Sequence, residues 1–103
     1  ERAPGEAFGY SGEGFEYMAR FVEKKTGTSF ETLAERLVFA PSGMTETAYT
    51  RRPWFEGRIA LPHDRDGTPL APQIASRYIA SDDVFSTPRD YARFLIGLIE
   101  RQG

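Results

Sequence analysis

Hydrophobic residues recur at helical spacing in three segments of this chain of 103 residues. The first segment spans residues 13–26, and its hydrophobic positions follow i, i+3, i+4 and i+7: Phe15, Met18, Ala19 and Val22. This spacing lines one face of an α-helix. Gly27 comes next, and glycine is the usual residue beyond the last turn. The pattern predicts a helix over residues 13–26.

A second helix is predicted from Ser29 to the residue before Pro41. The sequence Thr28-Ser29-Phe30-Glu31 has the form of a capping box, in which a hydroxyl accepts a free backbone N–H and the glutamate reaches back to another. The hydrophobic positions along one side are Phe30, Leu33, Ala34 and Leu37. Pro41 ends the helix, and Met44 is expected to be buried after the turn.

The third helix carries three agreeing start signals. Thr87 is a helix-capping residue, Pro88 suits the first helical position, and Asp90 places an acid in the first turn. The pattern continues to about Arg101, with a predicted buried side of Tyr91, Phe94, Leu95, Leu98 and Ile99. We therefore expect a helix over residues 88–101.

Between residues 48 and 86 four prolines interrupt every candidate element. We expect a long loop, with room for one short hairpin that turns at Asp66-Gly67. The fold class predicted from the sequence is mainly α, with about three helices and this loop.

The hydrophobic faces of the first and third helices are too wide for one packing surface. Tyr17 and Phe21 extend the first face to about 200° of the helix circumference at 100° per residue. Ala92 and Ile96 widen the third well beyond the ~100° of an ordinary surface helix. Three helices and a loop cannot cover both. We infer a part of a larger domain, or an obligate oligomer that associates through exposed apolar helix faces.

Composition excludes several classes of partner. The net charge is −2 and no basic cluster is large enough to follow a phosphate backbone, so nucleic acid is not expected. No run of 18 apolar residues predicts a membrane span. The absence of cysteine excludes disulfides and thiolate metal sites, and we expect no metal and no cofactor. Composition leaves the cellular location open.

Four motifs suggest chemistry that their context does not support. Ser11 lies in Gly9-Tyr10-Ser11-Gly12-Glu13, which lacks the final glycine of G-x-S-x-G, and the only histidine, His63, lies in a distant loop. Lys25-Thr26-Gly27 ends a predicted helix instead of lying on an edge strand. His63-Asp64-Arg65-Asp66-Gly67 lacks most ligands of a calcium loop. We interpret these as a helix cap, a helix end and a solvated turn, and the pair Asp82-Asp83 as loop charge.

Several stretches together resemble a known family. They are PGEAFGYSGEGF (residues 4–15), KTGTSF (25–30), FAPSGMTET (39–47) and STPRDYARF (86–94). Their order and spacing resemble the middle of β-lactamase-like serine hydrolases, the family of class C β-lactamases, D-alanyl-D-alanine peptidases and related esterases. The resemblance implies that residues 1–103 form a single partial domain, the helical middle of an α/β (α+β) fold. The S-x-x-K segment would precede it and the K-T-G-like strand would follow.

The resemblance also implies site residues. Tyr10 matches the tyrosine of the family's Y-x-N motif, whose hydroxyl moves a proton beside the nucleophilic serine and lysine. A nearby ammonium group favours the ionised form of a phenol, which suits a general base. Gly12 stands where the motif has a substrate-binding asparagine, and Ser42 where the family usually has leucine. No serine here is followed three residues later by lysine, so the nucleophile is expected outside this chain.

The function expected from the resemblance is that of an acyl-enzyme hydrolase in the intact parent protein. Its substrate would be an amide or ester: a β-lactam, a peptidoglycan peptide or a small ester. This region alone would be inactive, and the family favours a periplasmic or extracellular location. Two alternatives stay open: a non-catalytic relative that keeps the fold for binding or scaffolding, which Gly12 favours, and a free-standing helical interaction module.

Overall fold

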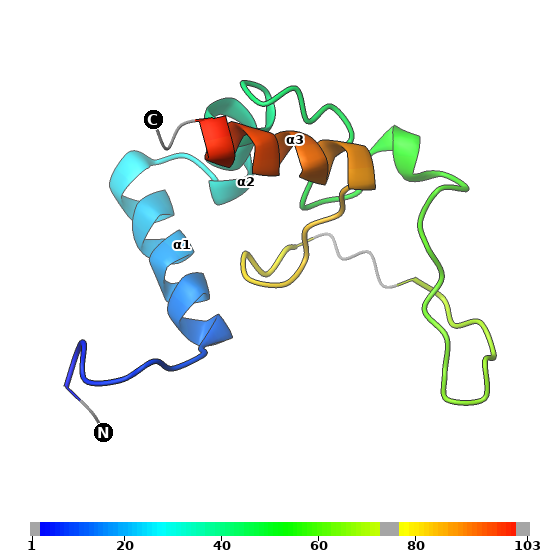
Figure 1. Cartoon of the computed structure of the whole chain (residues 1–103), viewed down its shortest axis with the longest axis horizontal. Coiled ribbons are helices and arrows are strands. Elements are labelled where there is room, and N and C mark those ends of the chain that lie inside the picture. The colour runs from blue at the N-terminus through cyan, green and yellow to red at the C-terminus, as the bar shows by residue number, and fades with distance from the viewer. Residues whose placement is uncertain (1–2, 73–76, 101–103) are drawn as a thin grey trace.

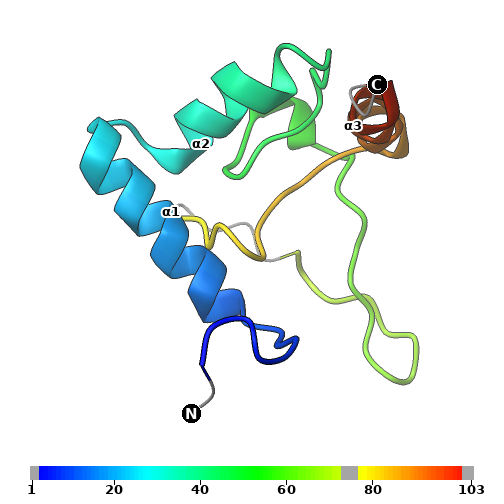
Figure 2. The same ribbon diagram turned by 60° about the vertical axis from the view of Figure 1, so that its left-hand side comes forward.

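The computed structural model describes residues 3–72 and 77–100. Its regular elements in chain order are α1 (Gly12–Thr26), α2 (Phe30–Ala34), the π-helical turn η1 (Glu35–Phe39), the 3₁₀ turn η2 (Pro53–Phe55) and α3 (Pro88–Glu100). Figure 1 shows α1 at one side and a long loop that extends away from the helices at the other. Helix α2 follows next to the end of α1, and the turned view in Figure 2 shows α3 across the molecule from α1. The described residues contain no β-sheet, which confirms a mainly α region.

Helix α1 begins and ends as its sequence predicts. The Ser11 hydroxyl accepts the Gly14 N–H at 3.0 Å, so Ser11 is the N-cap. Gly27 has φ +66°, a left-handed conformation that residues with a Cβ adopt at a cost, and its N–H donates to the Glu23 carbonyl. Lys25-Thr26-Gly27 is therefore a helix end.

Helix α2 is capped differently from the prediction. Ser29 accepts the Thr32 N–H at 3.2 Å, as a capping serine should. The Glu31 side chain does not complete the box, because its Oε1 accepts the backbone N–H groups of Tyr49 and Thr50 at 3.1 and 2.9 Å. These two amides lie in a loop 18 and 19 residues further along the chain. The helical turns continue through η1 and end before Pro41, as expected.

Helix α3 is fastened to the loop after η1 by Asp90. The side chain is fully buried, and its Oδ2 accepts the Glu46 N–H at 2.7 Å and the Thr47 hydroxyl at 3.0 Å. Arg93 bridges Asp90 Oδ1 at 3.1 Å and the Gly43 carbonyl at 2.6 Å. The predicted helix start is confirmed, whereas the predicted last residue, Arg101, lies outside the described residues.

The long loop is held at two points. Ala48 and Phe85 exchange both backbone hydrogen bonds, at 3.0 and 2.9 Å, and form an isolated antiparallel bridge. The predicted turn at Asp66-Gly67 is present, with Gly67 at φ +82° and a single bridge between His63 and Pro69. This hairpin projects from the body of the molecule in both ribbon views (Figures 1 and 2).

The core lies between α2, η1 and the start of α3. Its buried members are Ala34, Phe39 and Met44, against which Val38, Tyr49 and Phe94 pack. The predicted buried side of α3 is wrong for this chain apart from Phe94, since Tyr91, Leu95, Leu98 and Ile99 are 41–72% exposed. Leu37 of η1 is also exposed. No element within the described residues covers these side chains.

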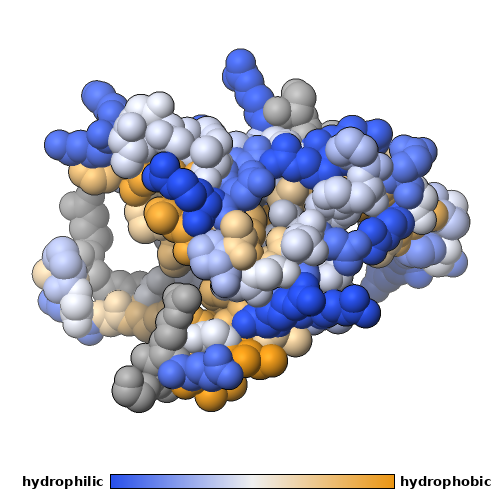
Figure 3. Space-filling view, turned by 90° about the horizontal axis from the view of Figure 1, so that it is seen from above, coloured by the Kyte–Doolittle hydropathy of each residue, from blue (hydrophilic) through white to orange (hydrophobic). Residues whose placement is uncertain are grey.

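The total accessible surface is large for a chain of this size. The accessible surface is 8446 Å², whereas a folded monomer of 11.6 kDa exposes about 5,800 Å². The radius of gyration is 16.3 Å, against about 13 Å for a compact domain of this length. Figure 3 shows hydrophobic residues reaching the surface between hydrophilic ones. Both quantities agree with the wide apolar faces read from the sequence.

Candidate functional site

Tyr10 lies in the extended segment that leads into α1. Ser11 is extended, with φ −150° and ψ 108°, and Gly12 begins the helix directly after it. The cap made by Ser11 fixes where the chain enters α1, and Tyr10 precedes that cap by one residue. Its side chain is 90% exposed. Tyr10 therefore does not pack against the core of this chain. Its hydroxyl is accessible to another molecule or to another part of the parent protein.

A hollow of about 470 Å³ opens beside Tyr10. It is lined by two segments far apart in sequence, the entry to α1 and a turn before α3: Tyr10, Gly12, Glu13, Glu16, Ile79, Ser81 and Asp82. A Cβ added to Gly12 would stand 3.5 Å from the Ser81 hydroxyl oxygen. Because Gly12 has no side chain, the space between these two residues stays open. The structure thus brings the two predicted site residues, Tyr10 and Gly12, to one hollow.

The wall opposite Tyr10 is a closed turn of residues 79–83. The Asp82 and Asp83 N–H groups both donate to the Ile79 carbonyl at 3.0 Å, and the Ile79 N–H donates to Asp83 Oδ2 at 2.6 Å. Asp83 is therefore a structural acceptor within the turn. Asp82 instead lines the hollow. The two adjacent aspartates, which the sequence suggests to be loop charge, therefore lie in different surroundings.

Ala80, at the centre of this turn, is held from both sides. Its N–H donates to Glu16 Oε2 of α1 at 2.8 Å, and its carbonyl accepts the Tyr49 hydroxyl at 3.3 Å. Burial, followed by the negative charge of Glu31, raises the pKa of the Tyr49 phenol. The hydroxyl therefore keeps its proton at neutral pH and remains a donor to Ala80. These contacts fix the turn between α1 and the core.

A charged cluster on α1 continues from Glu16. Arg20 contacts Glu16 at 2.6 Å and Glu23 at 2.9 Å, and its guanidinium lies 5.9 Å from the centre of the Tyr78 ring. Glu23 accepts the Phe30 N–H at 2.8 Å and the Tyr78 hydroxyl at 2.7 Å. These hydrogen bonds, the Phe30 amide first, lower the pKa of Glu23.

Tyr78 responds to the same cluster in the opposite direction. Burial, and then its hydrogen bond to the Glu23 carboxylate, raise the pKa of the Tyr78 phenol. The ionised Glu23 and the protonated Tyr78 are thus the stable pair at neutral pH. Together they join α1, the start of α2 and the segment that leads into the turn.

The other motifs found in the sequence lie away from this hollow. His63 is exposed in the projecting hairpin, and Asp64 Oδ1 accepts the Asp66 and Thr68 N–H groups at 2.9 Å, which is a turn and no calcium loop. Within residues 3–72 and 77–100 no three histidine or carboxylate side chains come together to hold a metal ion.

None of the helices in this described part of the chain has both the length and the apolar composition of a membrane span.

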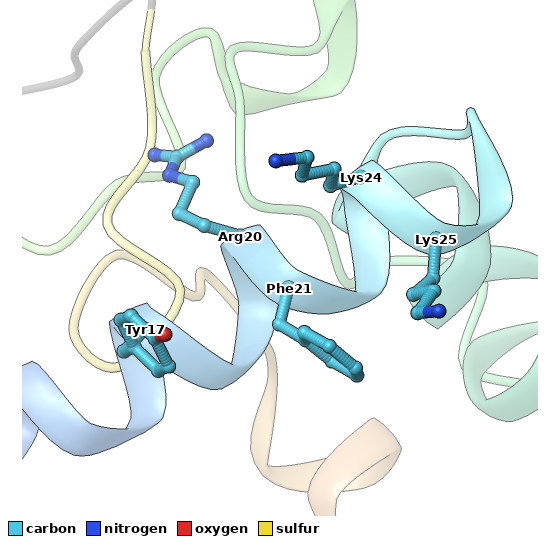
Figure 4. Close-up of a pocket in the computed structure, with 5 residues that line it drawn as sticks. All are labelled: Tyr17, Arg20, Phe21, Lys24 and Lys25. Atoms are coloured by element: carbon cyan, nitrogen blue, oxygen red, sulfur yellow. The ribbon is translucent and has the colours of Figure 1, made fainter.

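A larger hollow of about 650 Å³ runs along α1, and its character differs. It is lined by Tyr17, Arg20, Phe21, Lys24 and Lys25, all from this one helix (Figure 4). Tyr17 is 78% and Phe21 55% exposed. The side chains of a single helix do not enclose a cavity, so we interpret this hollow as an uncovered face of α1 that carries two aromatic and three cationic residues.

Sequence reasoning missed Ser81 in the far wall and the two residues, Glu16 and Tyr49, that hold this wall in place. Glu16 resembles any surface glutamate at i, i+4 from an arginine, and Tyr49 and Ser81 lie in segments without periodicity. Their contacts join residues 31 and 64 positions apart. Only the tertiary structure brings them together.

Comparison with known proteins concerns the fold of the whole chain. The chain is similar to a D-alanine carboxypeptidase from Burkholderia cenocepacia (26% identity, TM-score 0.74, 90% of this chain and 27% of that chain). It is similar to the octameric penicillin-binding protein homologue from Pyrococcus abyssi (27% identity, TM-score 0.77, 100% of this chain and 24% of that chain). It shares the fold of a D-amino acid amidase from Ochrobactrum anthropi (20% identity, TM-score 0.69, 99% of this chain and 33% of that chain).

The chain spans about a quarter to a third of the length of these solved relatives. No curated protein matches it. The family model described as Beta-lactamase matches residues 1–103, which is the whole chain. This chain therefore belongs to the β-lactamase family, as a mainly helical region of that fold.

Proposed function

We propose that the parent protein of this region is a serine hydrolase that works through an acyl-enzyme. Its substrate is an amide or ester: a β-lactam, a peptidoglycan peptide or a small ester. The observation that carries the proposal is Tyr10, whose phenol is 90% exposed on the rim of the hollow. Relatives of the same fold bear the names carboxypeptidase, β-lactamase and amidase, all of them hydrolases.

In this proposal Tyr10 is the acid and base of the reaction. Its oxygen takes the proton of the serine hydroxyl as that serine attacks the substrate carbonyl, and returns it to the leaving group. The serine and lysine of S-x-x-K come from a part of the parent outside residues 1–103, since no serine here has lysine three residues later. Gly12 lines the substrate space, and this region alone is inactive. The rest of the domain covers the apolar faces of α1 and α3.

The first test is acyl-enzyme formation. The intact parent is incubated with a fluorescent penicillin and, separately, with a p-nitrophenyl ester. The mass of the protein is then measured by mass spectrometry. We expect an adduct with at least one of them. Folded parent protein that gives no adduct with either refutes the proposal.

The second test replaces the proposed proton carrier. Tyr10→Phe removes only the hydroxyl, and turnover should fall by roughly 10²-fold or more, the usual contribution of a positioned acid or base. Tyr17→Phe is the matched control, because Tyr17 is also exposed but is not among the residues that line the hollow. Equal turnover of the two variants would exclude Tyr10 from proton transfer.

A non-catalytic relative with the same fold is the second candidate. Gly12 favours it, because the family motif places an asparagine at this position. The sequence of the parent distinguishes the two functions: without S-x-x-K ahead of residue 1 the parent cannot form the acyl-enzyme. Self-association through the apolar faces is tested separately, by light scattering of residues 1–103 alone.

A further inference from the structure

We propose that Ser81 is a specificity-determining residue, whose hydroxyl hydrogen-bonds a polar group of the substrate, and that Glu16 positions it. This rests on the proposed function of Tyr10. Ser81 is exposed and lines the hollow that Tyr10 and Gly12 also line. Among the described residues that line the hollow, Tyr10 and Ser81 are the two that carry a neutral hydroxyl.

The position of Ser81 relative to Gly12 gives the first argument. A Cβ at residue 12 would stand 3.5 Å from Ser81 Oγ, so a polar side chain at residue 12 would extend into the space that Ser81 borders. With glycine at residue 12, no side chain of that residue stands against the Ser81 hydroxyl. A serine hydroxyl can donate and accept, so it suits an amide, which presents an N–H and a carbonyl.

The rigidity of the turn gives the second argument. A hydroxyl discriminates between substrates only if its backbone is fixed. The residue before Ser81 is fixed on both sides: the Ala80 N–H donates to Glu16 at 2.8 Å and its carbonyl accepts from Tyr49 at 3.3 Å. The turn also closes on itself through Ile79 and Asp83.

Glu16 is itself held in place. Its Oε1 contacts Arg20 at 2.6 Å, which leaves Oε2 directed to the Ala80 N–H. The Glu16 side chain is 26% exposed, so it is partly shielded from water. Glu16 joins the helix that follows Tyr10 to the turn that carries Ser81, and thereby sets the width of the hollow.

The test compares two esters of equal chain length on the intact parent protein. p-Nitrophenyl N-acetylglycinate carries an amide on the acyl side, and p-nitrophenyl pentanoate does not. The measured quantity is the ratio of kcat/KM for the first ester to that for the second, after subtraction of spontaneous hydrolysis. Ser81→Ala should lower this ratio by roughly 3- to 10-fold, as expected for the loss of one neutral hydrogen bond. Ser42→Ala, a serine far from the hollow, is the control and should leave the ratio unchanged.

Three further variants separate recognition from damage to the fold. Gly12→Asn in the Ser81→Ala background places an amide in the same space and should restore the ratio. Glu16→Ala should lower the ratio as Ser81→Ala does, whereas Glu16→Gln keeps an oxygen acceptor for Ala80 and should retain it. An unchanged ratio in Ser81→Ala overturns the assignment of Ser81, and equal ratios in the two Glu16 variants overturn the role of Glu16.

The outcomes also distinguish this inference from the proposed function. If Tyr10→Phe slows both esters while Ser81→Ala leaves the ratio unchanged, the catalytic proposal stands and the role of Ser81 is refuted. If Tyr10→Phe slows neither ester, the proposed function is refuted whatever Ser81→Ala does. A parent protein that hydrolyses neither ester overturns the specificity assignment.

Discussion

Replacing Asp90 by alanine should destabilise the parent protein more than any exposed substitution in this region. Asp90 is 0% exposed and accepts hydrogen bonds from the Glu46 N–H, the Thr47 hydroxyl and Arg93. After Asp90→Ala the Glu46 N–H loses the hydrogen-bond acceptor that it has among the described residues. Thr47 keeps its contact with Ser86 at 2.8 Å, and Arg93 keeps the Gly43 carbonyl at 2.6 Å.

The magnitude follows from these partners. A hydrogen bond to a charged group contributes about 1.5–3 kcal/mol. Arg93 is 43% exposed, so its pair with Asp90 contributes little more than a surface ion pair. Two bonds remain, from Glu46 and Thr47, and we take the lower end of the range because the variant no longer buries a carboxylate. The free energy of unfolding should fall by about 3 kcal/mol. Asp90→Asn, which keeps the volume and one acceptor, should lose about half of that.

The assay is urea unfolding of the parent protein followed by circular dichroism, with midpoint and slope measured for each variant. Asp66→Ala is the matched control, because Asp66 is an exposed residue of the projecting hairpin and such changes stay within about 0.5 kcal/mol. If Asp90→Ala were no more destabilising than Asp66→Ala, the buried carboxylate would not be what fastens α3.

Two more predictions concern α1. Glu23 has a lowered pKa in the folded chain, so its contribution to stability is present above the ordinary pKa of 4.5 and is lost as pH falls through the lower folded value. Glu23→Gln should therefore flatten the fall of the unfolding free energy below pH 4.5, and an unchanged acid profile would contradict the Glu23 contacts with Phe30 and Tyr78. Gly27→Ala should cost about 1 kcal/mol, because φ is +66° there; a melting temperature equal to that of the wild type would show that the left-handed end of α1 is not required.

The local elements could be predicted from the sequence because their signals are local. The Ser11 hydroxyl and Gly27 bound α1 within one residue of the prediction, and Asp66-Gly67 turns the hairpin. Each of these depends on a few neighbouring residues whose backbone preferences agree. The family resemblance suggests Tyr10 and Gly12 as site residues, and this stays a prediction; in the structure both residues line one hollow.

The contacts made over long distances could not be predicted in this way. Glu31 fits a capping box, yet its carboxylate serves the amides of Tyr49 and Thr50, which no pattern pairs with it. The predicted burial of Leu95 and Ile99 fails because a helical stripe shows which face is apolar but not which element covers it. No sequence pattern indicates Ser81, because its proposed role depends on its distance from Gly12 in the folded chain.

The bridge between Ala48 and Phe85 has a practical consequence for protein engineering. The bridge joins the two ends of a 36-residue loop, so an insertion in the middle of the loop leaves the pairing of its ends in place. Lengthening a loop whose ends are already joined adds little entropy cost, about 0.6 kcal/mol for each doubling. An epitope or fluorophore-binding peptide grafted between Asp66 and Gly67, where every neighbour from residue 61 to 70 is exposed, should report on the protein without disturbing either Asp90 or the Tyr10 hollow.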